Sequence, residues 1–267
     1  KFAMDIAWIL VGLLTATVAA LVALISHSVK YDSADNVLAE VASEREKIHA
    51  KLTPEMRAVS LSEALHLIKT RRSIFEKDFT GKRVPESIIE KMLEGANWAP
   101  THGKTEPWRF VIVSGEALRN LGDVIAEETE SKLEKESEEW HRFVKRQTRR
   151  VKERKNISHS IAICMKRVKS RKGKFMPEWE DSAAVACAVQ NMHLIATAAG
   201  VAGYWSSSGV CGGLNSEKVK KILGLSGEGD KCMGFFNVGL SDRISKYKAF
   251  RKPWEDKVTW LRDLKLS

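Results

Sequence analysis

The side chains best suited to chemistry are concentrated in four short stretches of the 267-residue chain. The first is "RRS", made of Arg71, Arg72 and Ser73, which follows a stretch of helical spacing. Arginine stays charged at any ordinary pH and presents a planar fork of donors, so two guanidiniums beside a hydroxyl suit a phosphate group. The alternative is a helix end, at which arginine meets the negative pole of the helix dipole.

The second stretch, "NWAPTHGKTEPWRF" at residues 97–110, places Trp98 and His102 in a loop ahead of an apolar run. Pro100 and Pro107 restrict the backbone, so the loop can hold both rings against a flat ligand. His102 is the candidate catalytic group, as a proton donor. A packed aromatic corner, with His102 in a purely structural contact, is the alternative.

The third stretch, "GYWSSSG", joins Trp205 to the hydroxyls of Ser206 and Ser207 among small residues that allow close backbone approach. The fourth, "FRKP", adds the guanidinium of Arg251 and the neighbouring Lys252. No metal site is expected, because the four cysteines lie far apart without a CxxC pair. The same spacing argues against a disulfide framework and favours reduced, mostly buried thiols.

The elements that must position these stretches follow from capping and periodicity. Ser60 and Glu63 form a capping box that begins a helix ending at "TRRS", and a second helix begins at Val84-Pro85. The run "WRFVIVSG" predicts a strand, residues 116–155 a long charged helix, and "HSIAICMK" a second strand. A further helix, "SEKVKKILGL", precedes the strand "CMGFFNVGL". Helices around a few strands that do not form hairpins indicate an α+β or α/β layered domain.

The stretch "EDSAAVACAVQNMHLIATAAG" predicts a helix that ends at Gly200. It is apolar nearly all round, so most of its sides must be buried. Such a helix belongs at the centre of the fold or of a dimer.

The four stretches in this order resemble the nitroreductase family of flavin mononucleotide (FMN) enzymes, over about residues 60–263. The match is closest to the minimal branch that includes the bacterial YdjA protein. The resemblance implies an α+β fold with a central mixed sheet flanked by helices, in an intertwined homodimer. It implies that Arg71, Arg72 and Ser73 hold the flavin phosphate and pyrimidine edge, and that a partner-side loop brings in Trp98 and His102.

The same resemblance implies that Trp205, Ser206 and Ser207 approach the isoalloxazine and that Arg251 approaches the phosphate. The expected reaction is hydride transfer from NADH or NADPH through FMN to a small-molecule acceptor that the sequence does not identify. A charged insertion at about residues 125–155 is longer than in compact bacterial members, which removes any inference about substrate. The iodotyrosine deiodinases share the fold and a membrane anchor, but their substrate-gripping lid residues are not recognisable here.

The uncharged run at residues 6–26 would span about 31 Å as a helix, close to the hydrocarbon thickness of a bilayer. It predicts a single-pass transmembrane anchor at residues 1–30, with a helical stalk at 31–59 and the flavin domain at 60–267. An organellar membrane and a bacterial inner membrane both remain open. The alternative function is an accessory subunit of a larger membrane complex that keeps the flavin fold.

The formal charge of +10 comes mainly from residues 141–174, which contain fourteen Lys or Arg and one Glu. A solvated helix face is the ordinary meaning of such a run, and an anionic membrane surface or an acidic partner is the alternative. Nucleic-acid binding is not expected, because no aromatic stacking platform or reading helix accompanies the charge.

Overall fold

The computed structural model describes residues 59–207 and 213–261 of the chain. The chain divides into two compact units, Lys1–Ala64 and Leu65–Ser267. The predicted anchor at residues 6–26 and nearly all of the predicted stalk lie outside the described residues. Within the two described ranges, no helix combines the length and the apolarity that crossing a membrane requires.

The first described helix, α2, spans Leu61–Thr70 and begins at the predicted capping box. The Ser60 amide donates to Glu63 Oε2 over 2.8 Å, and the Glu63 amide donates to Ser60 Oγ over 3.1 Å. These reciprocal bonds satisfy two of the amides that a helix start leaves unpaired. Leu65 and Ile68 of α2 remain exposed, so this helix buries no apolar face against the described chain.

The sheet has the order β1-β2-β4-β3, and every neighbouring pair runs antiparallel. Its strands are β1 (Trp108–Val113), β2 (His159–Met165), β3 (Ala202–Ser206) and β4 (Lys231–Gly239). The expected mixed sheet is therefore wrong. The long connection from β2 to β3 does bring the two strands into the same direction, but β4 lies between them and pairs antiparallel with both.

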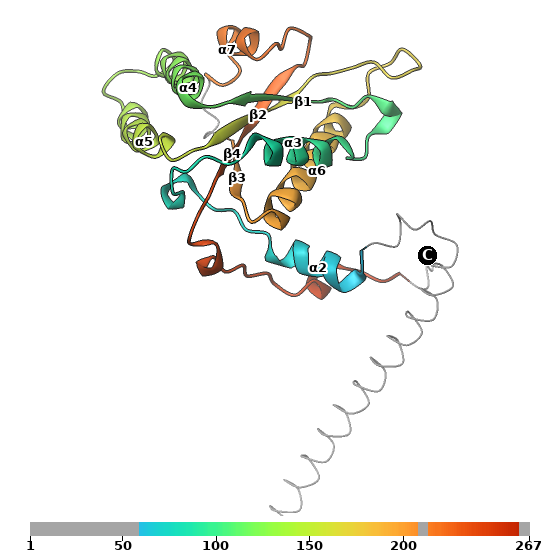
Figure 1. Cartoon of the computed structure of the whole chain (residues 1–267). Coiled ribbons are helices and arrows are strands. Elements are labelled where there is room, and N and C mark those ends of the chain that lie inside the picture. The colour runs from blue at the N-terminus through green and yellow to red at the C-terminus, as the bar shows by residue number, and fades with distance from the viewer. Residues whose placement is uncertain (1–58, 208–212, 262–267) are drawn as a thin grey trace, which may run out of the picture. The chain divides into compact units, whose positions relative to one another are not determined.

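Helices cover both faces of this sheet (Figure 1). On one face, α3 (Glu86–Asn97) and α6 (Glu178–Ala198) pack on a core that includes Met92, Ile161 and Phe236. On the other face, α4 (Gly115–Glu130) and α7 (Glu217–Ile222) enclose a second cluster with Leu121, Ala162 and the buried free thiols of Cys164 and Cys232. The fold is thus an α+β layered domain, as predicted. Short 3-10 turns complete it at Glu76–Asp78, His102–Lys104, Ile244–Lys246 and Glu255–Lys257.

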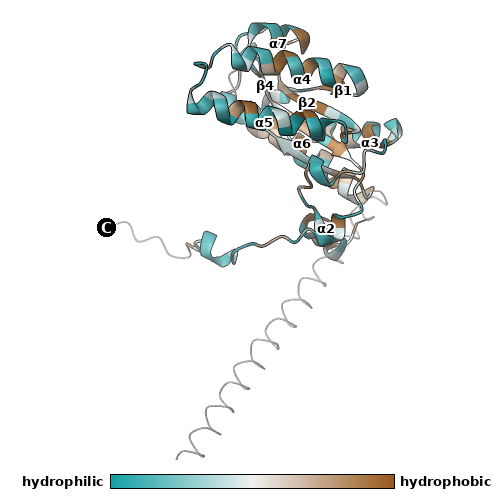
Figure 2. Ribbon diagram, turned by 90° about the vertical axis from the view of Figure 1, so that its left-hand side faces the viewer, coloured by the Kyte–Doolittle hydropathy of each residue, from teal (hydrophilic) through white to brown (hydrophobic). Residues whose placement is uncertain are grey.

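The charged segment predicted as one helix over 116–155 is two helices, α4 and α5 (Glu138–Arg154). The chain breaks because Glu136 adopts a left-handed conformation, with φ of 62°, and Ser137 then caps a new helix. Ser137 Oγ accepts the Trp140 amide over 3.1 Å. Figure 2 shows that the outward sides of both helices are hydrophilic, which agrees with a solvated charged face.

The central helix α6 ends as predicted, with Gly200 in the left-handed region at φ of 68°. Within one chain it is buried along a stripe that includes Val185, Val189 and Met192. Leu194 and Ile195 are half-buried, and Ile195 packs on Gly95 of α3. From Asp181 to Thr197 only Ala183 and Gln190 are exposed, so the predicted burial on most sides is found within one copy of the chain.

Candidate functional site

The side chains of Arg71, His193 and Arg251 lie together where α2 ends beside the C-terminal part of α6. Arg71 lies next to His193, with Nη1 3.4 Å from His193 Nδ1. Burial, and then the positive charges of Arg251 and Arg72, lower the pKa of Arg71. Over residues 59–207 and 213–261, no ion pair with a carboxylate includes any of these arginines. The cluster is a site of excess positive charge that favours an anion.

Arg72 plays a different part from Arg71. Its Nη1 donates to the carbonyls of Lys69 and Arg71 over 2.6 and 2.8 Å, and its Nε donates to the Tyr247 carbonyl over 3.1 Å. The helix-end alternative therefore describes Arg72, whose side chain closes α2 and ties it to the C-terminal segment.

Ser73, the residue after Arg72, is exposed, so its hydroxyl is available to a ligand. The next amide, of Ile74, donates to the Gly203 carbonyl over 3.2 Å, which fixes this part of the chain against β3. The "RRS" stretch is therefore held between a helix end and a strand, as a phosphate-binding stretch would need to be.

His193 is the residue of this cluster that the sequence prediction missed. Its Nε2 lies 2.9 Å from the Arg72 carbonyl, which can only accept, so Nε2 carries the proton and Nδ1 faces Arg71 as the acceptor. Burial and the charge of Arg71 lower the pKa of His193 to about 4. A neutral imidazole thus fixes the backbone and one arginine of the cluster. The signal available in the sequence was a single imidazole on a mainly apolar helix.

Of the predicted loop residues, His102 lies at the other end of α6. His102 Nδ1 is 2.6 Å from Glu180 Oε2, in the first turn of that helix, and the His102 side chain is 68% exposed. Trp98 is 83% exposed, which is unusual for so large an aromatic side chain. Neither residue lies in a packed aromatic corner, so that alternative is wrong for the single chain.

Glu180 and His193 are thirteen positions apart in α6, which corresponds to about 20 Å along the helix axis. One copy of the chain therefore does not bring His102 to the arginine cluster. Trp98 lies nearer the C-terminal part of α6, because its amide and Asn191 Nδ2 both donate to the Gly95 carbonyl.

Trp205 and Ser206 end the edge strand β3. The Trp205 indole packs on the core and donates to the Met233 carbonyl over 3.0 Å, so its side chain is a structural element of this face. Gly234 approaches the backbone of Ser206 and Ser207 so closely that a Cβ there would collide with it. Ser207 itself is exposed, so its hydroxyl is accessible to a ligand.

Comparison with known proteins gives evidence that does not depend on the geometry of the site. The nitroreductase family model matches residues 68–240. The NAD(P)H nitroreductase-type protein YfhC of Bacillus subtilis is 29% identical over 195 residues, which is 72% of this chain and 91% of YfhC. Mouse iodotyrosine deiodinase 1 is 29% identical over 153 residues, which is 53% of each chain.

Solved structures agree on the fold. A nitroreductase-like protein from Bacillus cereus superimposes with a TM-score of 0.60 at 24% identity, covering 77% of this chain and 99% of that one. NfnB of Mycobacterium smegmatis, an FMN-dependent nitroreductase solved with NADPH, gives 0.55 at 17% identity, covering 76% of this chain and 100% of NfnB. At these identities the likeness establishes the fold alone. Together with the family match over most of the folded unit, it shows that the chain belongs to the nitroreductase family.

Proposed function

We propose that this protein is a membrane-anchored, homodimeric nitroreductase-type flavoenzyme of the minimal YdjA-like branch, passing hydride from NADH or NADPH to a small-molecule acceptor. As a member of its family it is an FMN-dependent NAD(P)H oxidoreductase. The anchor rests on the uncharged run at residues 6–26, and the membrane would be organellar or a bacterial inner membrane.

The observation that carries the proposal is the arginine cluster without a counter-charge. Arg71 is partly buried beside the positive charges of Arg251 and Arg72, an arrangement that costs free energy unless an anion neutralises it. The phosphate of FMN is such an anion, and the exposed Ser73 hydroxyl adds a donor. These residues fit the phosphate end of the cofactor.

Bound FMN would supply the two-electron chemistry, taking hydride from the reduced nicotinamide and passing it to the acceptor. The chain supplies position and charge. Arg71 and Arg251 would hold the phosphate, while Arg72 and His193 fix the backbone that carries them. The end of β3 at Ser206 and Ser207 would line the ring system.

The distance between His102 and the arginine cluster supports a site shared between two copies of the chain. In such a dimer Trp98 and His102 of one copy would cover the ring system held by the arginines of the other. His102 would donate Nδ1–H to Glu180 and keep Nε2 available for proton exchange with the acceptor. The half-buried Leu194 of α6 offers apolar surface for this contact.

Flavin titration tests the phosphate assignment. Arg71→Gln should weaken FMN binding at least about tenfold, the loss expected for a hydrogen bond to a charged group. Riboflavin, which lacks the phosphate, should bind the variant and the parent protein alike. Lys91→Gln removes the same charge from the exposed side of α3 and should change neither affinity. An equal loss with FMN and riboflavin would contradict the assignment.

Mixing of variants tests the shared site. Arg71→Gln and a Trp98→Ala/His102→Ala variant should each turn over poorly alone. Random reassortment of two such subunits gives about a quarter of sites free of both changes, so the mixture should recover about that share of activity. No recovery after verified subunit exchange would place the whole site within one chain.

A further inference from the structure

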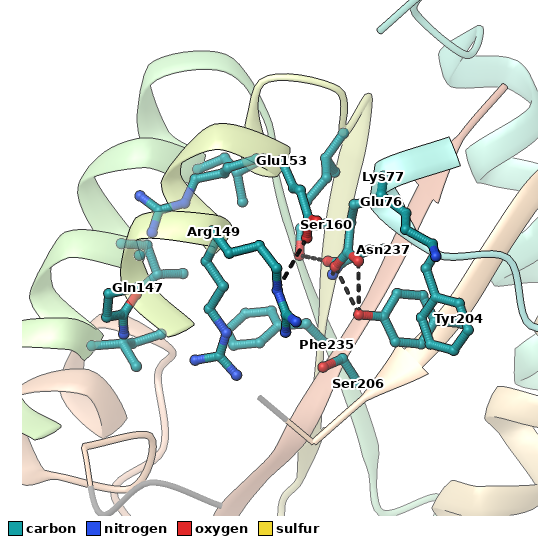
Figure 3. Close-up of a pocket in the computed structure, with 18 residues that line it drawn as sticks. Glu76, Lys77, Gln147, Arg149, Glu153, Ser160, Tyr204, Ser206, Phe235 and Asn237 are labelled. Atoms are coloured by element: carbon teal, nitrogen blue, oxygen red, sulfur yellow. Dashed lines mark hydrogen bonds and ion pairs between the residues drawn. The ribbon is translucent and has the colours of Figure 1, made fainter. Parts of the chain in front are cut away.

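A cavity of about 450 Å³ lies on the sheet face opposite α3 and α6, beneath α5 (Figure 3). Its floor comes from β2, β3 and β4, and its roof from α4 and α5, the charged insertion that the family resemblance left without a role. This volume is within the range of small-molecule sites. Arg71, His193 and Arg251 do not line it, so it is distinct from the arginine cluster.

The floor of the cavity is a hydrogen-bonded chain that ends on a carboxylate. Glu76 accepts from the Tyr204 hydroxyl, 2.9 and 2.8 Å from its two oxygens, and from Asn237 Nδ2 over 2.6 Å. Asn237 Oδ1 in turn accepts from Ser160 Oγ over 2.6 Å. Burial and the neighbouring Glu76 raise the pKa of Tyr204, so its hydroxyl keeps its proton. Figure 3 shows Glu76, Tyr204 and Asn237 gathered on one side of the cavity.

Glu76 has acceptor positions left for a further donor. A carboxylate has about four acceptor positions, and the Tyr204 hydroxyl and one Asn237 N–H supply only two protons. The chain brings no further donor to these oxygens from within the described residues. A ligand that reaches the floor is therefore selected for an N–H or O–H at its inner end.

Cationic side chains also line the cavity. Arg149 and Arg150 line it from α5, and Figure 3 shows Arg149 on the side away from Tyr204. Lys77 lines it from the turn that carries Glu76. Arg149 Nε forms an ion pair with Glu153 Oε2 over 3.8 Å, and Glu153 also lines the cavity. Arg150 and Lys77 join no ion pair within residues 59–207 and 213–261. The two guanidiniums offer forked donors to an anion, and Lys77 offers a point charge. Between floor and mouth the walls are apolar, formed by Leu118, Leu121, Ile125, Ile157 and Phe235.

We propose that this cavity is a binding site for a small organic anion with an apolar, flat body, a carboxylate that meets Arg149 and Arg150, and an N–H or O–H donor that meets Glu76. Each part of that description corresponds to one part of the lining. The charged insertion thereby acquires a function in ligand recognition. The lining of this cavity and the arginine cluster share no residue, and the cavity meets the proposed flavin site at Ser206.

Calorimetric titration of the full-length protein with indole-3-acetate tests this inference, because that probe joins an N–H, an apolar ring system and a carboxylate. We expect binding with a dissociation constant below about 1 mM, a value typical of small ligands with a few polar anchors. Tryptophol, which lacks the carboxylate, and 1-methylindole-3-acetate, which lacks the N–H, should each bind at least about tenfold more weakly.

Matched variants locate the binding. Arg150→Gln should weaken indole-3-acetate at least about tenfold and leave tryptophol unchanged. Arg146→Gln removes the same charge from the exposed side of α5, outside the cavity, and should have no effect. Glu76→Gln should remove the preference for indole-3-acetate over its N-methyl analogue. Absence of binding at 10 mM probe, about ten times the expected constant, or equal effects of Arg150→Gln and Arg146→Gln, would overturn the proposal. FMN affinity, measured on the same variants, reports on the flavin assignment separately.

Discussion

The imidazole of His193 makes a quantitative prediction about acid stability. Its pKa is about 4 in the folded chain, against 6.5 for an unperturbed histidine. Between these values the unfolded chain binds more protons than the folded chain, so the free energy of unfolding falls as the pH falls. The loss begins near pH 6.5 and is complete below pH 4. At pH 5 it amounts to about 2 kcal/mol relative to pH 8, and in full to about 3 kcal/mol.

Urea denaturation followed by tryptophan fluorescence, at half-unit steps from pH 8 to pH 5, measures this loss. His159 is also buried, and burial lowers its pKa too, so the parent protein alone cannot isolate His193. His193→Gln keeps an amide that can donate to the Arg72 carbonyl and removes the titration. The difference in unfolding free energy between parent and variant should therefore shrink by about 2 kcal/mol between pH 8 and pH 5.

His66→Gln, on the exposed side of α2, is the matched control and should run parallel to the parent protein at every pH. Parallel curves for His193→Gln as well would refute the reasoning, because they would mean that the buried imidazole titrates alike in both states. Saturating FMN should lessen the loss, since a phosphate beside Arg71 offsets the positive charge that helps to lower the pKa of His193.

Three further substitutions test the scaffold by thermal or urea denaturation. Phe236→Ala empties the centre of the larger core and should cost about 3–5 kcal/mol, and a loss below about 1 kcal/mol would show that the site collapses around the gap. Gly203→Ala puts a Cβ 2.8 Å from the Phe236 ring and 2.9 Å from the Asn237 carbonyl, and should cost about 1–3 kcal/mol, whereas an unchanged midpoint would contradict this tight packing. Ser137→Ala removes the cap of α5 and should cost about 1 kcal/mol, while Ser131→Ala, in the same connection, is the control. Equal effects of the two serine changes would mean that the break does not depend on the cap.

Helices and strands were predicted well where the signal lay within a few neighbouring residues. The capping box at Ser60, the left-handed Gly200 and the apolar runs of β1, β2 and β4 all needed only neighbouring residues. The break in the charged segment was also local, since Ser137 is an ordinary N-cap residue, but continuous charge concealed it. The sheet pairing failed for another reason: whether β4 inserts between β2 and β3 is decided by long-range packing.

The site residues divide in the same way. "RRS" was recognisable because the residue types themselves suit a phosphate, yet the structure gives its two arginines different tasks. Arg72 donates to backbone carbonyls, one of which belongs to Tyr247, 175 positions away in sequence. No spacing rule connects residues so distant. His193 joined the site only because α6 brings it beneath the end of α2.

In the proposed dimer, the arginine cluster of one copy and the loop residues Trp98 and His102 of the other form one site, so neither group is complete in a single chain. Arg71 carries a charge that the described chain does not neutralise, and Trp98 presents an aromatic surface that the described chain does not cover. The crowded cation raises the free energy of the folded state, and the exposed indole leaves apolar area in water that a partner could bury. Both are relieved if one ligand and one partner copy meet there. A flavin held by the arginines of one copy and covered by the loop of another neutralises the charge and buries the indole in one step, so dimerisation and cofactor binding should strengthen each other.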